Sequence, residues 1–89
     1  MTNEEILKHM SGKLDAELDS AEGYLKMVKN LSSTGYTDEY LASGLVEMAH
    51  DEYSHAVFIA KMIENCEGVI TKEQNKRIDD LDDEIKRFF

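Results

Sequence analysis

Residues 47–55 contain two Glu-x-x-His patterns whose side chains could bind a metal ion: Glu47 with His50, and Glu52 with His55. If this segment is helical, residues three apart lie one turn apart on the same face, so both side chains of a pair can reach one cation. A mixture of carboxylate oxygen and imidazole nitrogen suits iron, manganese or zinc. The chemistry that these residues could carry is therefore metal binding, with electron transfer if the metal is iron.

The position of each pair on the predicted helix distinguishes the two patterns. At about 100° per residue from Leu41, Glu52 falls near ~+20° and His55 near ~−40°, within the apolar stripe of the helix. Glu47 and His50 fall on the opposite, solvated side and serve as an internal control. A carboxylate within an apolar stripe is costly unless it is paired or bound to a metal. Glu52 and His55 are therefore the candidate ligands, with a structural hydrogen-bonded pair or a salt bridge to a lysine as the alternative.

A preceding helix supplies a matching carboxylate. In an antiparallel hairpin, residues equally far from the connection lie at the same height. With the connection at about residues 31–37, Glu52 lies fifteen residues after it and Glu17 fourteen residues before it. Glu17 and Tyr24 share one shoulder of the apolar stripe, whereas Glu22 lies on the other shoulder and nearer to the turn. We therefore expect Glu17 to be level with Glu52, and Glu22 to be a solvated flank residue.

The elements that must position these residues are three predicted helices, over about residues 3–30, 38–67 and 72–88. Apolar residues recur at every third or fourth position in each of them. Each helix begins near a threonine that can cap its N-terminus: Thr2, Thr37 and Thr71. Gly68 marks the end of the second helix. The sequence therefore predicts a single all-α domain over residues 1–89, in which a long antiparallel hairpin is followed by a shorter helix.

The composition excludes several classes of function. Ten Lys and Arg against nineteen Asp and Glu give a net charge of −9 over 89 residues. This charge argues against sequence-independent nucleic-acid binding and against attachment to anionic membranes. The acidic N-terminus lacks the features of a signal peptide, and no apolar run is long enough to span a membrane. A single cysteine, Cys66, fits a reducing compartment, so we expect a cytoplasmic protein.

A two-helix hairpin leaves apolar residues outside the seam between its helices. In the second predicted helix these residues lie on both flanks of the stripe, as Val46, Tyr53 and Val57 on one side and Tyr40 and Phe58 on the other. A second chain would cover them. We therefore expect a homodimer, or a larger homo-oligomer built from dimers, in which two hairpins form a four-helix bundle.

The combined spacing Glu17-x6-Tyr24 and Glu52-x2-His55, with thirty-five positions from the first glutamate to the second, resembles the first half of the iron-binding motif of ferritin-like proteins. Because only one such helix pair is present, the chain resembles the encapsulated ferritins, whose half-bundles dimerise. The resemblance covers residues 3–67. It implies that Glu17, Glu52 and His55 bind iron in a di-iron site and that Tyr24 donates a hydrogen bond to a ligating carboxylate.

The same resemblance implies a ferroxidase that oxidises Fe²⁺ for iron storage or detoxification. It also implies an encapsulin-type shell as a further partner, and hence a place within a protein nanocompartment. The family's additional acidic residues beside the first ligand are matched only by Asp19, and residues 82–89 predict a helix where the family has a flexible shell-targeting extension. The acidic run over residues 79–84 is typical of a solvated face, with a local enrichment of Fe²⁺ as the alternative.

The candidate ligands of one chain are half of the set that a di-iron carboxylate site in a four-helix bundle uses. One chain offers two glutamates and one histidine, so two chains would supply four carboxylates and two imidazoles. Four carboxylates balance the charge of two divalent cations, so metal binding would be linked to dimerisation. The alternative is a helical dimerising interaction module in which Glu52 and His55 are a structural polar pair.

Overall fold

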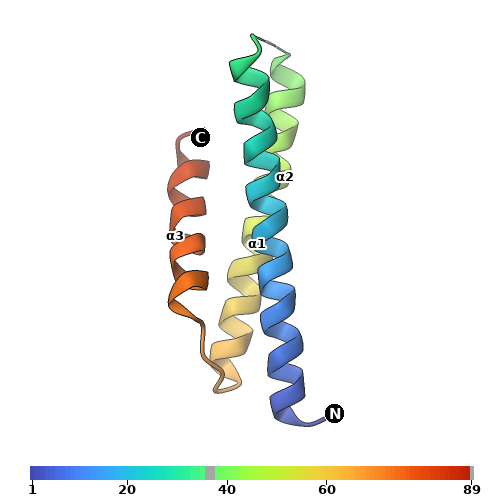
Figure 1. The fold of residues 1–89 in the computed structure, drawn as a ribbon, viewed down its shortest axis with the longest axis vertical. Coiled ribbons are helices and arrows are strands. Elements are labelled where there is room, and N and C mark those ends of the chain that lie inside the picture. The colour runs from blue at the N-terminus through green and yellow to red at the C-terminus, as the bar shows by residue number, and fades with distance from the viewer. Residues whose placement is uncertain (36–37, 89) are drawn as a thin grey trace.

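The computed structural model describes residues 1–35 and 38–88 of the chain. These residues form three helices and no strand, as α1 (Asn3–Ser33), α2 (Glu39–Asn65) and α3 (Lys72–Lys86). Figure 1 shows α1 and α2 as a long antiparallel hairpin, with α3 lying along one side of it. The predicted all-α class is confirmed. No helix of the described residues is both long enough and apolar enough to cross a membrane.

The helix ends agree with the predicted caps at two of three positions. The Thr2 side chain accepts a hydrogen bond from the backbone N–H of Glu5, and Thr71 and Gln74 form a reciprocal capping box. The cap of α2 is Asp38, whose carboxylate accepts from the N–H of Leu41, whereas the predicted cap Thr37 lies outside the described residues. A carboxylate is well placed there, because the helix dipole is positive at the N-terminus.

The connection from α2 to α3 reverses the chain through a tight approach at Gly68. Glu67 takes a positive φ of 64°, and the N–H of Gly68 donates to the carbonyl of Ile63 at 2.8 Å. A β-carbon at Gly68 would lie only 2.7 Å from Ile63 Cγ2 and 2.8 Å from Leu7 Cδ2. Gly68 therefore ends the helix as predicted, but through the close packing of its backbone, while its neighbour adopts the left-handed conformation.

The core lies between α1 and α2, where leucines of α1 pack against alanines of α2. These buried residues are Leu14, Leu18 and Leu25 in α1, and Ala49, Ala56 and Ala60 in α2. Leu41, from which the positions on the predicted stripe were counted, is 41% exposed, and Met48 is 45% exposed. The buried side of α2 is therefore turned away from these two residues and toward its alanines. Glu52 and His55 consequently lie at the edge of the buried side.

The third helix covers one flank of the hairpin. Its residues Leu81 and Ile85 are buried, and the hydroxyl of Tyr53 on α2 donates to the carboxylate of Asp82 at 3.2 Å. Val46 is only 6% exposed, since it packs with residues of its own chain. The prediction that Val46 and Tyr53 require a second chain was therefore wrong.

The opposite flank of the hairpin stays open. Tyr40 is 91% exposed and Phe58 is 63% exposed, so both predicted flank residues on that side lack a cover within the described chain. Contiguous exposed apolar patches can mark an interaction surface, whereas single exposed apolar residues are common. The predicted need for a second chain to cover apolar side chains therefore applies only to this flank.

Candidate metal centre

Glu17 of α1 lies beside Glu52 and His55 of α2, and one ligand atom from each side chain comes within 4.8 Å of the others. The Nδ1 atom of His55 is 3.6 Å from Glu17 Oε2 and 4.0 Å from Glu52 Oε2. The predicted level match between Glu17 and Glu52 across the hairpin is therefore confirmed. The three side chains form a cluster that we call the Glu–His cluster, in which two carboxylates and one imidazole converge on a common point.

Burial falls steeply across the Glu–His cluster. The side chain of Glu17 is 11% exposed, that of Glu52 is 27% exposed and that of His55 is 60% exposed. Oε2 of Glu17 is buried and accepts no hydrogen bond from the described residues. A buried carboxylate oxygen without a partner is costly, and such atoms are uncommon in folded proteins. This oxygen is therefore the acceptor in the cluster that is available to a ligand.

The two carboxylates of the cluster differ in proton affinity because they lie so close together. A hydrogen bond from the Glu52 carboxyl lowers the pKa of Glu17, with help from Lys13 and His55 and against the effect of burial. The same hydrogen bond, together with burial and the charge of Glu17, raises the pKa of Glu52. The closeness of the two carboxyl groups therefore moves their pKa values apart, with Glu17 the stronger acid of the pair.

Tyr24, which the family resemblance implies as a hydrogen-bond donor to a ligating carboxylate, lies among apolar side chains. It is half-buried and packs against both apolar clusters of the hairpin. Its hydroxyl makes no hydrogen bond to Glu17 or Glu52 among the described residues. Tyr24 therefore belongs to the packing around the Glu–His cluster, and the predicted hydrogen bond to a ligand is not formed in this chain alone.

The control pattern behaves as its position on the helix predicts. Glu47 and His50 are both exposed, and the ring of His50 lies 6.4 Å from that of Tyr53, at a tilt of 43°. No third carboxylate or imidazole among the described residues joins them in a metal-binding group. The Glu-x-x-His spacing alone therefore does not produce a candidate site.

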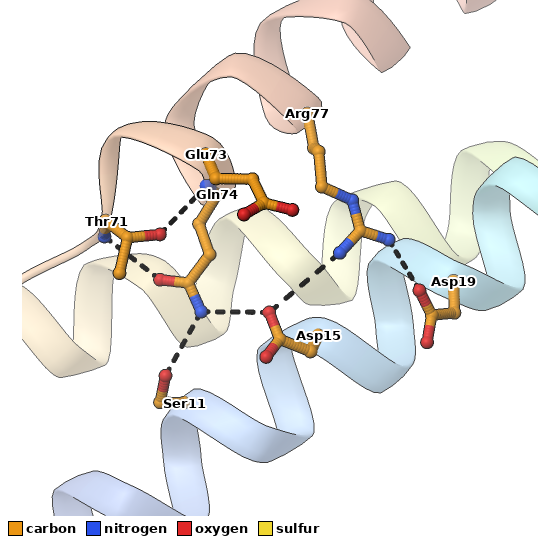
Figure 2. Close-up of a pocket in the computed structure, with 7 residues that line it drawn as sticks. All are labelled: Ser11, Asp15, Asp19, Thr71, Glu73, Gln74 and Arg77. Atoms are coloured by element: carbon orange, nitrogen blue, oxygen red, sulfur yellow. Dashed lines mark hydrogen bonds and ion pairs between the residues drawn. The ribbon is translucent and has the colours of Figure 1, made fainter.

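A polar pocket of about 400 Å³ lies between α1 and the start of α3, and Figure 2 shows its lining. The buried amide of Gln74 donates to Ser11 Oγ at 3.1 Å and to Asp15 Oδ1 at 3.0 Å. Its carbonyl oxygen accepts from the backbone N–H of Thr71. The polar groups of Gln74 are thus satisfied within the chain, so its buried amide is not available to a ligand in this pocket.

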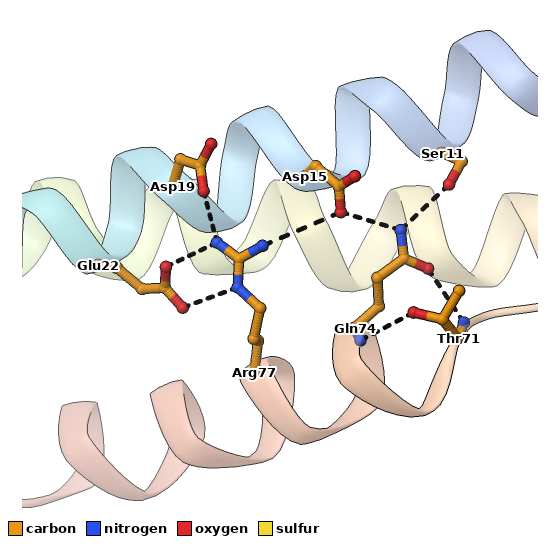
Figure 3. Close-up of polar contacts among 7 residues, drawn as sticks. All are labelled: Ser11, Asp15, Asp19, Glu22, Thr71, Gln74 and Arg77. Carbon is orange, nitrogen blue, oxygen red and sulfur yellow. Dashed lines mark hydrogen bonds and ion pairs between the residues drawn. The ribbon is translucent and has the colours of Figure 1, made fainter.

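Three carboxylates of α1 converge on Arg77 of α3 beside that pocket, as Figure 3 shows. Arg77 binds Glu22 through Nε at 2.9 Å and Nη2 at 2.6 Å, and it binds Asp19 through Nη2 at 2.6 Å. Asp15 lies 4.0 Å from Nη1. These hydrogen bonds raise the pKa of Arg77, led by the pair with Glu22 and opposed by burial. We call Asp15, Asp19, Glu22 and Arg77 the arginine cluster.

The arginine cluster corrects one prediction and qualifies another. Glu22 is a bidentate partner of Arg77 and ties α3 to α1, so its description as a solvated flank residue was wrong. Asp19, which matched the family's extra acidic residues, also faces α3. The signal was present in the sequence as an acidic row at helical spacing on α1, at positions 15, 19 and 22. Choosing its partner required the position of α3.

No family model, curated protein or solved structure matches this chain. The arguments for a function therefore come from the side chains themselves. Of these, the Glu–His cluster has an unpartnered buried acceptor, whereas the arginine cluster has its own cation. The donor types of the Glu–His cluster suit Fe²⁺, Mn²⁺ or Zn²⁺, and three ligands from one chain leave coordination positions open.

Proposed function

We propose that this chain is a ferritin-like iron-binding protein that oxidises Fe²⁺ at a di-iron carboxylate site shared by two copies, for iron storage or detoxification. The observation that carries the proposal is Oε2 of Glu17, which is buried without a hydrogen bond and lies 3.6 Å from His55 Nδ1. A divalent cation between these atoms would satisfy the oxygen and use the imidazole nitrogen that already faces it. Iron is the substrate in this proposal.

The ligand count supports a site shared between two chains. Di-iron carboxylate sites in four-helix bundles take one glutamate from each of two helices and a Glu-x-x-His pair from each of the other two. One hairpin supplies Glu17 on α1 and the pair Glu52 and His55 on α2. A second copy related by two-fold symmetry would complete the set. The combined charge of four carboxylates would then balance two Fe²⁺ ions.

The surface around the Glu–His cluster supports the same arrangement. Met48 and Phe58 on α2 are 45% and 63% exposed and, with His55, fall within roughly 80° of the helix circumference. On α1, Glu17 lies roughly 140° around the helix from Glu22, which binds α3. The cluster therefore lies on the flank that α3 leaves open. A metal site shared by two chains needs an incomplete ligand set on each chain and an apolar surface around it on which the chains can pack.

The redox step balances with dioxygen as the oxidant. Two Fe²⁺ ions each give up one electron, and O₂ takes both electrons and two protons to become hydrogen peroxide. The protein contributes Glu17 and Glu52, whose negative charges favour the more highly charged Fe³⁺. Both protons are taken from solvent, because Glu52 would bind the metal as a carboxylate and carries no proton in that state. His55 completes the ligand set from the exposed side of the cluster.

The proposal is tested by iron binding and oxidation in protein purified without added metal. Fe²⁺ is added anaerobically and bound iron is measured by elemental analysis after desalting. Air is then admitted, and ferric absorbance is followed against a protein-free control. We expect about one iron per chain and oxidation faster than the control. Protein that binds no iron and oxidises Fe²⁺ no faster than buffer would overturn the proposal.

A dimerising interaction module is the second candidate, and the exposed ring of Phe58 favours it. Such a module would dimerise with equal affinity in the presence and absence of divalent metal. A ferroxidase with a shared site would instead show tighter dimerisation when metal is bound, because the ligands of both copies meet there. Sedimentation velocity with Co²⁺ or with EDTA separates the two candidates.

A further inference from the structure

The Glu–His cluster has a resident cation at its edge, Lys13. Its Nζ atom lies 3.6 Å from Glu17 Oε1, on the other carboxylate oxygen from the one that faces His55. The Lys13 side chain is 66% exposed, whereas the Glu17 side chain is 11% exposed. A flexible, mostly solvated ammonium group therefore meets the most buried ligand of the candidate site.

The geometry of this ion pair makes it weak. Charge-assisted hydrogen bonds between nitrogen and carboxylate oxygen are typically about 2.7–2.9 Å long, and 3.6 Å is longer than that. Lysine four residues before glutamate is also the less favourable order of the two on a helix. The ammonium end of the pair is solvated, which weakens its attraction to the carboxylate. Lys13 therefore neutralises Glu17 without holding it firmly.

Arg77 provides the contrast within the same chain. It contacts Glu22 and Asp19 at 2.6 Å, its side chain is only 21% exposed, and its planar guanidinium makes two hydrogen bonds to one carboxylate. A cation held in this way is a permanent part of the fold. Lys13 has none of these features, since it offers a single long contact from a solvated chain.

We infer that Lys13 is a displaceable counter-ion, which neutralises the Glu17 carboxylate in the metal-free chain and moves away when a divalent cation binds. The inference rests on the proposed function, since it concerns the same site. Because Lys13 must be displaced, the affinity of the cluster for a divalent cation is slightly lower than it would be without the lysine. Lys13 therefore raises the concentration of free metal at which the cluster is half filled. Because two copies share the site, two such lysines would act on it.

The test uses Co²⁺, which binds oxygen and nitrogen ligands and is not oxidised by air under these conditions. Its dissociation constant is measured by calorimetry for the wild-type chain, Lys13→Gln, Lys13→Arg and the control Lys8→Gln. Lys8 is an exposed lysine of α1, and its substitution changes the net charge by the same amount. Circular dichroism checks that each variant is folded.

We expect Lys13→Gln to bind Co²⁺ about two- to fivefold more tightly than the wild-type chain, and Lys8→Gln to bind it unchanged. Lys13→Arg should bind it more weakly than the wild-type chain, because a guanidinium competes better for a carboxylate. Equal affinities for wild type and Lys13→Gln, or an equal gain in Lys8→Gln, would overturn the inference and leave the proposed metal site standing. A wild-type chain that binds neither Co²⁺ nor Fe²⁺ would overturn both together.

Discussion

Helix α1 presents carboxylates on two sides, and the two groups of carboxylates have different partners. Asp15, Asp19 and Glu22 meet Arg77 of α3, whose guanidinium satisfies them within the chain. Glu17 meets Glu52 and His55 of α2 and keeps one buried oxygen without a partner. The arginine cluster has more acidic residues, but the buried carboxylate oxygen without a hydrogen-bond partner is in the Glu–His cluster.

The comparison shows what separates a structural acidic cluster from a candidate site. In the arginine cluster, the cation is part of the protein and its rigid, planar group matches the carboxylate geometry. In the Glu–His cluster, Lys13 makes a long contact from solvent, and the imidazole is mostly exposed. Among the described residues, the Glu–His cluster therefore has no firmly held cation of the kind that Arg77 provides.

The largest expected effect comes from exchanging one carboxylate for its amide in each cluster. Glu17→Gln should slow Fe²⁺ oxidation by more than about 100-fold, since even outer partners of metal ligands can cost that much. Glu22→Gln, the matched change in the arginine cluster, should oxidise Fe²⁺ at close to the wild-type rate. Initial rates of ferric absorbance growth measure both. Equal losses in the two variants would show that the comparison is wrong.

The next effect concerns the open flank beside the Glu–His cluster. Phe58→Ser should weaken dimerisation by more than about tenfold, because burying a phenylalanine side chain contributes about 1.5–3 kcal/mol. Val69, which is 84% exposed in the connection between α2 and α3, is the control, and Val69→Ser should leave dimerisation unchanged. Sedimentation equilibrium gives both dissociation constants. A Phe58→Ser variant that dimerises like the wild-type chain would place the interface elsewhere.

The arginine cluster should matter for stability and little for iron. Arg77→Met keeps the apolar stem but removes the charge, and we expect it to lower the free energy of unfolding by about 1–2 kcal/mol. The loss is moderate because Asp19 and Glu22 can be hydrated again. Urea denaturation measures this change, with Lys76→Gln as the exposed control, which should cost much less. Loss of iron oxidation in folded Arg77→Met would contradict the division into two clusters.

The smallest effect is a pH dependence at the α2–α3 contact. The hydrogen bond from Lys86 lowers the pKa of Asp82 below 3.8, against burial and with help from Tyr53. The folded pKa is then below the unfolded value, so the contribution to stability is present above pH 3.8 and is lost as the pH falls through the folded pKa. Asp82→Asn should remove this part of the acid sensitivity. Urea midpoints at pH 6 and pH 3 measure it, and an unchanged difference between these two midpoints would contradict the assignment.

The hairpin and the level match of Glu17 with Glu52 could be predicted because both follow from local rules. Helical periodicity and capping residues set the helix ends to within a few positions. Helix α1 runs to Ser33, because the hydroxyls of Ser33 and Thr34 donate hydrogen bonds to the last free carbonyls of the helix. Counting outward from the connection then aligns the two helices. Both the hairpin and the level match therefore depend only on the local sequence and the length of the connection.

The side on which α3 packs could not be predicted in the same way. It depends on contacts between residues more than fifty positions apart, such as Arg77 with Glu22 and Gln74 with Ser11. Helical periodicity carries no information about such distant pairs. The cover of Tyr53 also comes from α3, through Asp82, whereas Val46 is buried by residues of the hairpin itself.

The close approach at Gly68 has a consequence for the handedness of the molecule. A three-helix chain can place its last helix on either side of a hairpin, giving two mirror-related arrangements of the helices. The Gly68 backbone fits against Ile63 and Leu7 with no room for a β-carbon, and Glu67 reverses the chain beside it. Gly68 therefore acts together with the distant contacts of Gln74 and Arg77 in setting the direction in which α3 departs. A side chain at this position would have to displace Ile63 or Leu7, so we expect a substitution there to disturb the path of the chain into α3.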